Sequence, residues 1–273
     1  MILLGMFLAV SIPSNVFAGG VQVFPVYLFL NAPTRSVTLS VTNPLERPQE
    51  AWVEFRYGYP VPGDSGKFAM RYVDPPYTGE PSAVPWMKAY PQRFIMGPKE
   101  SQVIRVVVAP PLGVQPGEYW ARVVVSSTDQ TTAKPANPGG GITMKLKYIN
   151  QIDVPFHFRT GGPKTGLLIR GVQTTLAAGK MNLGIDVNRT GNAAFWGKLT
   201  VTIRNRDGKI LKNDDHPVAI YKDLLYPASI DITTIPPGTY TLDVVFTSRR
   251  PGMQSRYLLT IDPVRFSQEL VIP

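Results

Sequence analysis

Few residues in this sequence could carry out catalysis. The 273 residues contain two histidines, His157 and His216, and no cysteine. Without cysteine, disulfides, thiolate catalysis and zinc sites built of Cys and His are excluded. A Ser-His-Asp triad would have to use one of the two histidines. His157 lies between apolar positions of an alternating segment, where we expect it to face solvent, and His216 lies in the polar stretch Asp214 to Pro217, which predicts a turn.

The remaining candidates for chemistry are weaker. Asp214 and Asp215 are adjacent, and a calcium loop needs its carboxylates at alternate positions. Gly139 to Gly141 is not followed by Lys-Ser or Lys-Thr, which a phosphate-binding loop requires. We therefore expect no metal, no cofactor and no enzyme activity. A hydrolase that uses His157 or His216 is the least favoured alternative, and binding is the class of function to pursue.

The positive charge does not predict a nucleic-acid-binding surface. The net charge is +9. Residues 19–160 hold 14 Lys and Arg against 10 Asp and Glu, and residues 161–273 hold 14 against 9, so the excess is spread over both halves. A surface dedicated to nucleic acid would concentrate its cations.

The first 18 residues have the features of a secretory signal peptide. An apolar run ends in Val16-Phe17-Ala18, which fits the cleavage pattern of small residues before Gly19. The alternative is a buried strand. No later run is long and apolar enough to span a bilayer, so we expect an exported protein that is not inserted in a membrane.

Short segments of alternating apolar and polar residues, separated by turn signals, predict an all-β protein. They lie at the positions given by Val21–Phe29, Ser36–Val41, Ala51–Tyr57, Gln102–Val108, Tyr119–Val125, Leu167–Val172, Met181–Val187, Lys198–Ile203, Tyr240–Phe246 and Tyr257–Ile261. We expect two immunoglobulin-like β-sandwich domains, residues 19–159 and 160–273. The sequence Thr160-Gly161-Gly162-Pro163 continues neither a helix nor a strand, and it predicts the short hinge between them.

A weak internal repeat supports two similar domains. Pro116-Gly117-Glu118-Tyr119 is echoed by Pro237-Gly238-Thr239-Tyr240, and apolar residues follow both. An immunoglobulin-like sandwich places a tyrosine corner at this point. The alternative is two ordinary Pro-Gly turns before strands.

The longest alternating segment covers residues 142–158, with apolar residues at nearly every even position. Strands seldom exceed about 10 residues, so one sheet can hardly cover all of it. The preceding residues 126–141 are polar and rich in Pro and Gly, which predicts a mobile loop. Together they predict a partly unpaired strand with an exposed edge. The alternative is a long hairpin strand that packs on its own domain.

Three segments in the first half resemble one family. Val37 to Asn43, Tyr90 to Arg105 and Pro116 to Tyr119 are similar, in their order and spacing, to the N-terminal domain of the periplasmic pilus chaperones, the PapD-like proteins. The resemblance covers about Gly20 to Arg159, and the second half is similar to their second domain with less specificity.

The resemblance implies a function. Members of this family act in the periplasm, lend a strand to an incomplete pilus or fimbrial subunit and deliver that subunit to an outer-membrane usher. The lent strand falls here on Ile142, Met144, Leu146 and Tyr148. The alternative is an exported structural or adhesive protein that binds glycan, peptidoglycan or another envelope protein during cell wall organization.

The resemblance also implies roles for charged residues. Arg105 and Glu118 match residues of an ion pair that joins the two domains, and Asp262 is a candidate acidic partner. In contrast, Tyr27 stands where the family has an arginine that holds the client carboxylate, and Asp153 or Pro155 stands where the family has a lysine.

Because charge-assisted pairing to a carboxylate needs a cation, other basic residues become the candidate anchor. These are Arg35, Lys145 and Lys147. Without such an anchor, either the protein is a divergent member that holds its client in a different way, or it does not act as a chaperone.

Overall fold

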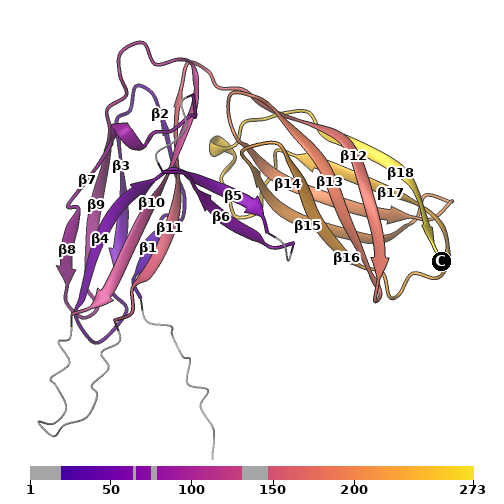
Figure 1. The fold of residues 1–273 in the computed structure, drawn as a ribbon, viewed down its shortest axis with the longest axis horizontal. Coiled ribbons are helices and arrows are strands. Elements are labelled where there is room, and N and C mark those ends of the chain that lie inside the picture. The colour runs from indigo at the N-terminus through magenta and orange to yellow at the C-terminus, as the bar shows by residue number, and fades with distance from the viewer. Residues whose placement is uncertain (1–19, 64–65, 75–78, 131–146) are drawn as a thin grey trace, which may run out of the picture.

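The computed structural model describes residues 20–63, 66–74, 79–130 and 147–273. These residues form two immunoglobulin-like β-sandwiches, set at an angle to each other and joined by a short connection (Figure 1). The predicted signal peptide, residues 1–18, lies outside the described residues. The part of the chain described here contains no helix long and apolar enough to cross a membrane.

The first sandwich consists of two sheets with the strand orders β1-β3-β9-β7 and β2-β11-β10-β4-β8. Its strands are β1 (Gln22–Phe24), β2 (Leu28–Asn31), β3 (Ser36–Thr42), β4 (Gln49–Arg56), β7 (Met87–Tyr90), β8 (Arg93–Met96), β9 (Ser101–Val108), β10 (Gly117–Asp129) and β11 (Asn150–Thr160). A short 3-10 helix, η1 (Val84–Trp86), precedes β7. The alternating apolar residues of the two sheets meet in one buried core, as the period of two predicts.

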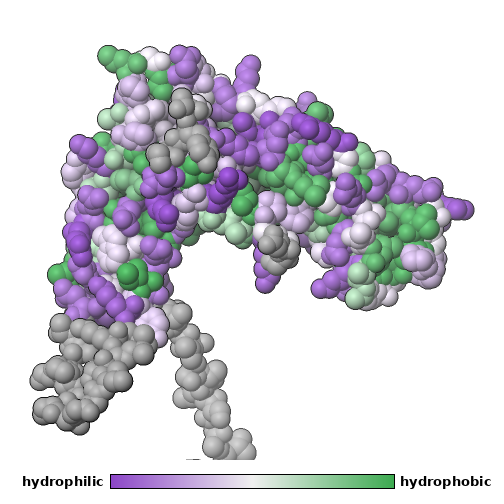
Figure 2. Space-filling model, in the orientation of Figure 1, coloured by the Kyte–Doolittle hydropathy of each residue, from purple (hydrophilic) through white to green (hydrophobic). Residues whose placement is uncertain are grey.

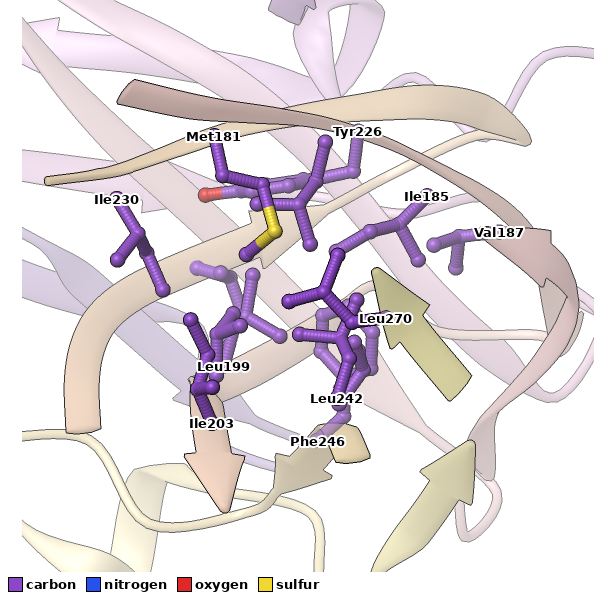
Figure 3. Packing of buried hydrophobic residues seen from close by; sticks show 14 of the residues in the cluster. Met181, Ile185, Val187, Leu199, Ile203, Tyr226, Ile230, Leu242, Phe246 and Leu270 are labelled. Atoms are coloured by element: carbon purple, nitrogen blue, oxygen red, sulfur yellow. The ribbon is translucent and has the colours of Figure 1, made fainter. Parts of the chain in front are cut away.

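The second sandwich has the strand orders β12-β13-β16 and β15-β14-β17-β18. Its strands are β12 (Thr165–Ala177), β13 (Lys180–Gly191), β14 (Phe195–Arg204), β15 (Ile210–Ile220), β16 (Leu224–Asp231), β17 (Gly238–Thr247) and β18 (Val264–Ile272), and a 3-10 helix, η2 (Ser255–Tyr257), lies before β18. Figure 3 shows how side chains from both sheets, among them Met181, Ile185, Leu242 and Phe246, fill the space between them.

Each sandwich contains the predicted tyrosine corner. The hydroxyl of Tyr119 donates a hydrogen bond to the carbonyl of Gln115 at 3.0 Å. The hydroxyl of Tyr240 donates to the carbonyl of Pro236 at 2.7 Å. In both cases the acceptor lies four residues upstream and the tyrosine lies near the start of a strand, so the sequence repeat corresponds to a structural one.

Several predicted segments differ from the observed strands. The segment Val21–Phe29 is divided into β1 and β2, which belong to different sheets. Tyr257–Ile261 contains no strand, since η2 occupies its start. The expected turn at Asp214 to Pro217 is part of β15, where pairing with β14 extends the strand through polar residues.

The loop predicted over residues 126–141 begins later than expected. Ser126 to Asp129 are the last residues of β10 and pair with β4, and Ser126 and Ser127 also pair with β11. Ladder hydrogen bonds on both sides of this central strand outweigh its polar composition. Residues 131–141 lie outside the described part of the chain.

A two-stranded hairpin that the sequence patterns missed extends from the first sandwich and contacts the second. It consists of β5 (Gly58–Pro62) and β6 (Phe68–Tyr72), which pair in antiparallel orientation. Figure 1 shows the hairpin projecting from the first sandwich toward the second, within the angle between them. The ring of Phe68 lies 5.1 Å from that of Tyr226 in β16.

Candidate functional site

The candidate site begins with the edge of β11. On one side, β10 pairs with β11 along Asn150 to Thr160. On the other side, β2 pairs only with Phe156 to Arg159. In the described part of the chain no strand covers residues 150–155 on that side, and we call this stretch the free edge. Its main-chain groups can accept another strand.

The residues before the free edge are only partly described. Ile142, Met144 and Leu146 lie outside the described residues. Tyr148 is 74% exposed, and neither it nor Ile149 belongs to a strand. The prediction of one unbroken strand over 142–158 is therefore wrong at residues 147–149, because β11 begins at Asn150.

The far end of β11 forms the junction between the two sandwiches. Nε of Arg159 donates a hydrogen bond to Oε2 of Glu118 at 2.6 Å. Oε1 of Glu118 accepts a hydrogen bond from the backbone N–H of Ala194, in the second sandwich, at 3.1 Å. Arg159 also donates to the carbonyl of Tyr257 at 2.8 Å. One buried carboxylate and one guanidinium thus hold both domains.

His157 lies inside this junction, and the expectation that it faces solvent is wrong. Its side chain is 0% exposed, with Nδ1 3.0 Å from Oε1 of Glu118 and Nε2 3.0 Å from the hydroxyl of Tyr221. The imidazole stacks on Phe29 with ring centroids 4.7 Å apart. It points away from the core of its own sandwich, as expected from the alternation, but the second sandwich covers that face.

The electrostatics of the junction keep Glu118 ionised. Burial alone would raise the pKa of Glu118, but His157 and Arg159 outweigh it and lower the pKa to about 2. Burial lowers the pKa of His157 below 6.5 and outweighs the attraction of Glu118. Which atom donates in the hydrogen bond between Nε2 of His157 and the hydroxyl of Tyr221 is set by the tautomer of the imidazole.

Aromatic side chains fill the rest of the junction. Tyr221 of the second sandwich is 1% exposed, and its ring lies 5.2 Å from that of Trp120. Trp196 contacts the ring of His157 edge-on. Tyr27 donates a hydrogen bond to the carbonyl of Gly252 at 2.6 Å. Buried aromatic contacts across the interface limit motion of the two sandwiches relative to each other.

A second ion pair lies at the other side of this aromatic cluster. Nζ of Lys222 donates to Oε2 of Glu80 at 2.6 Å, and the Tyr57 hydroxyl donates to the same oxygen at 2.5 Å. Burial and the neighbouring Glu80 carboxylate raise the pKa of Tyr57. The junction therefore has a polar anchor on each flank.

The predicted ion pair between Arg105 and Glu118 does not form. Arg105 lies on the exposed face of β9, where its guanidinium bonds to the hydroxyl of Ser36. The partner of Glu118 is Arg159, which the sequence reasoning missed. The contact of Glu118 in the second sandwich is the N–H of Ala194, not the carboxylate of Asp262. In β11 the even-numbered residues face the apolar core, so Arg159 lies on the opposite face. This placement was the feature of the sequence from which a contact of Arg159 outside the core could have been predicted.

The three candidate anchor cations are not brought together. Arg35 follows β2, whose Asn31 pairs with Arg159 beside the hinge, whereas Lys147 lies before the opposite end of β11. Lys147 is close enough to Glu50 to lower the pKa of that carboxyl, after Arg93 as the main cause. Lys145 lies outside the described residues.

The positions that depart from the family pattern have other roles. Tyr27 belongs to the junction, and Asp153 accepts a hydrogen bond from the hydroxyl of Tyr72. Pro155 lies opposite Arg122 on β10. Among the described residues there is no group of three or more His, Cys, Asp and Glu residues that could hold a metal ion.

The chain was compared with known proteins. No protein-family model and no curated protein matches it. A chain of the SafA pilin–SafB chaperone complex from Salmonella enterica is 14% identical, with a TM-score of 0.38 and coverage of 91% of this chain and 96% of that chain. The class 5 fimbriae chaperone CfaA is 15% identical, with a TM-score of 0.42 and coverage of 93% and 100%.

A third similar structure is a chain of the CsuC–CsuE pre-assembly complex, a chaperone with a tip adhesion subunit, from Acinetobacter baumannii. It is 11% identical, with a TM-score of 0.44 and coverage of 91% of this chain and 98% of that chain. These three solved structures are of fimbrial or pilus chaperones, and two of them also contain a subunit.

Proposed function

We propose that this protein is a periplasmic chaperone for pilus or fimbrial subunits. It acts by lending a strand to an incomplete subunit, and it delivers that subunit to an outer-membrane usher. The observation that carries the proposal is the free edge of β11, which continues from the alternating residues 142–148. An incomplete sandwich gains main-chain hydrogen bonds by pairing along such an edge.

The side chains of the lent segment supply the apolar part of the binding. In an extended segment, side chains at every second position face the same side. This applies to Ile142, Met144, Leu146 and Tyr148, which all have even numbers. Each contributes on the order of 1.5–3 kcal/mol when it becomes fully buried in a groove of the subunit. The entropy lost when the segment becomes ordered is subtracted from that sum. The 74% exposure of Tyr148 supports a role outside the protein's own core.

The contacts of the junction hold β11 in a fixed position, so the free edge is part of a rigid strand. The strand that carries the free edge also carries His157 and Arg159, which bind Glu118 and contact the second sandwich. Because the two ends of one strand are coupled, the position of the free edge relative to the second sandwich is set by the junction. A rigid element pays less entropy on binding than a loop does.

The test uses the full chain, expressed with its signal segment and purified from the periplasm under conditions that retain bound subunits. The variants Tyr148→Asp, Met144→Asp and Leu146→Asp place a charge where the proposal requires a dry contact, which is costly. Leu112→Asp is the matched control, since Leu112 is 103% exposed and lies in the β9–β10 connection, away from β11.

The expected result is that the parent and Leu112→Asp retain a co-expressed subunit that lacks a strand, while the three other variants lose it and stay folded by circular dichroism. Equal retention by all variants would refute strand lending. Unfolding of the variants at residues 144 and 146 would place that segment in the protein's own core and likewise refute it. Retention of a glycan or an unrelated envelope protein by every variant favours the adhesive alternative.

A further inference from the structure

The imidazole of His157 touches both sandwiches through its two ring nitrogens. Nδ1 lies 3.0 Å from Oε1 of Glu118 in the first sandwich, and Nε2 lies 3.0 Å from the hydroxyl of Tyr221 in the second. His157 is 0% exposed and Tyr221 is 1% exposed. The ring points away from the core that contains Phe156 and Phe158. A change in the ring therefore acts first on the junction, and not on the core of either sandwich.

The contact with Tyr221 depends on the number of protons on the ring. A neutral imidazole has one N–H and one acceptor nitrogen, whereas both nitrogens of the imidazolium donate. A neutral ring can therefore donate to Glu118 and accept from the Tyr221 hydroxyl at the same time. In the imidazolium, Nε2 can only donate, so the hydroxyl proton of Tyr221 needs another acceptor. Among the described residues, Nε2 of His157 is the sole hydrogen-bond partner of that hydroxyl.

The surroundings of the ring supply no spare acceptor in the part of the chain that the structure describes. Trp196 lies edge-on to His157 at 5.2 Å, and its indole N–H is itself buried without a partner there. Both carboxylate oxygens of Glu118 already accept other hydrogen bonds. A buried donor without an acceptor loses its hydration without compensation. Once the ring is an imidazolium, an arrangement that exposes the Tyr221 hydroxyl to water becomes favourable.

The charges around the ring also oppose a second proton. Glu118 attracts this proton and Arg159 and Arg122 repel it, but burial is the largest influence and holds the pKa of His157 below 6.5. The charged and titratable groups on the elements packed against the ring are Tyr27 before β2, Glu118 and Arg122 of β10, Arg159 of β11, Tyr221 and Lys222 between β15 and β16, Arg250 between β17 and η2, and Tyr257 of η2. Glu118 is the one carboxylate among them.

We propose that His157 is a pH-dependent switch between the two sandwiches. When the ring takes up a second proton, its contact with Tyr221 breaks, and the sandwiches move relative to each other while both remain folded. Contacts on the flanks of the junction, from Tyr27 to the carbonyl of Gly252 and from Lys222 to Glu80, do not involve His157. The movement takes place in the folded protein, and it does not depend on the proposed chaperone function.

The test measures a distance between the two sandwiches of the full chain as the pH changes. The chain contains no cysteine, so Val103→Cys and Leu168→Cys create two attachment sites for spin labels. Val103 of β9 is 57% exposed, and Leu168 of β12 is 54% exposed. Double electron–electron resonance gives the distribution of label distances from about pH 8 to about pH 5, the range in which histidine titrates. Amide hydrogen exchange of the central strands β3 and β14 reports whether each sandwich stays folded.

A second measurement follows the protonation of His157 itself. The chain has two histidines, so NMR of the imidazole C–H groups shows two sets of resonances. The spectrum of His216→Gln identifies the set that belongs to His157. The midpoint of this titration is then compared with the midpoint of the distance change. The comparison uses the parent residue at position 157, so it decides the matter even where a variant at that position does not fold.

The variant His157→Gln keeps a polar side chain that takes up no proton. Tyr27→Phe is the matched control, because it removes one hydrogen bond of the junction and leaves His157 in place. In the parent we expect the label distances to shift and their distribution to broaden as the pH falls. The midpoint should coincide with that of His157 and lie below 6.5. His157→Gln should give one distribution at every pH, and Tyr27→Phe should retain the transition.

Three outcomes overturn the proposal. The first is a distance distribution in the parent that does not change with pH, or that changes at a midpoint different from that of His157. The second is the same pH-dependent change in His157→Gln. The third is loss of amide protection in β3 or β14 at the midpoint of the distance change, because the proton would then unfold a sandwich instead of moving it.

Discussion

Arg159 and Glu118, on neighbouring strands of the first sandwich, form a buried ion pair with 2.6 Å between Nε and Oε2. The second carboxylate oxygen accepts from the backbone of Ala194 in the second sandwich. The relative placement of the two domains is therefore linked to the same strand, β11, that carries the free edge. Figure 2 shows that the two sandwiches enclose a hollow on the concave side of the molecule, below this junction.

Removing the charge of Glu118 should destabilise the protein. Glu118→Gln leaves Arg159 buried without its counter-ion, and breaking a buried pair costs about 3–5 kcal/mol. Urea unfolding followed by tryptophan fluorescence measures the change, because Trp120 and Trp196 lie in the junction. Glu54→Gln, at an exposed position, should change the free energy of unfolding by less than about 0.5 kcal/mol. Equal stabilities of the two variants would contradict the role of the pair.

Stability should fall with decreasing pH below 6.5. Burial lowers the pKa of His157 from 6.5, and His157 and Arg159 lower that of Glu118 from 4.5 to about 2 despite its burial. Both groups therefore take up protons more readily in the unfolded chain. By linkage, the free energy of unfolding decreases as the pH falls through 6.5 and again below 4.5.

Unfolding titrations at several pH values measure this slope. His157→Gln should flatten it between pH 6.5 and 4.5. A slope that survives in His157→Gln would show that other groups cause it.

The two tyrosine corners should contribute comparable amounts to stability. Tyr119→Phe and Tyr240→Phe each delete one hydroxyl and its hydrogen bond to a carbonyl four residues upstream. The expected loss is about 0.5–1.5 kcal/mol for each. Calorimetry of the single and double variants measures the losses, which should add because the two sites share no partners. A neutral effect at either site would show that water replaces the missing donor.

Gly197 and Gly171 should differ sharply in their tolerance of a methyl group. A Cβ at Gly197 would lie 2.1 Å from the carbonyl oxygen of Thr247, whereas a Cβ at Gly171 would meet nothing within 4 Å. Gly197→Ala forces β14 and β17 apart and should cost about 1–3 kcal/mol or more. Gly171→Ala should stay within about 0.5 kcal/mol of the parent. The midpoints of thermal unfolding of the two variants test this expectation. Equal midpoints would show that the sheet relaxes around the methyl group added at Gly197.

Much of the architecture follows from local patterns in the sequence. Alternation with a period of two places Val154, Phe156 and Phe158 in the core, and each is buried as expected. The two Gly-x-Tyr segments predict the tyrosine corners, and Gly161-Gly162 predicts the connection, where both glycines have a positive φ. Such signals depend on residues that are neighbours along the chain, so the sequence contains them.

The hairpin β5–β6 could not be predicted in the same way. Its strands are short, and β5 contains Pro60 and Pro62, a residue type that argues against a strand. Two strands alone are marginally stable in water. Here Tyr59 packs on Tyr221, and Phe68 packs on Tyr226. Both partners belong to the second sandwich, more than a hundred residues away.

The sequence by itself determined the fold class. It also determined which alternate residues of β11 face the core and which point away from it. Tertiary structure decided what meets that outward face. We expected His157 to face solvent, and Arg159 and Arg122 also lie opposite the core of their own sandwich. All three are buried, because the second sandwich brings Tyr221, Trp196 or Tyr257 against them. Burial of a polar side chain depends on segments distant along the chain. For that reason the partner of Glu118 emerged only from the arrangement in space.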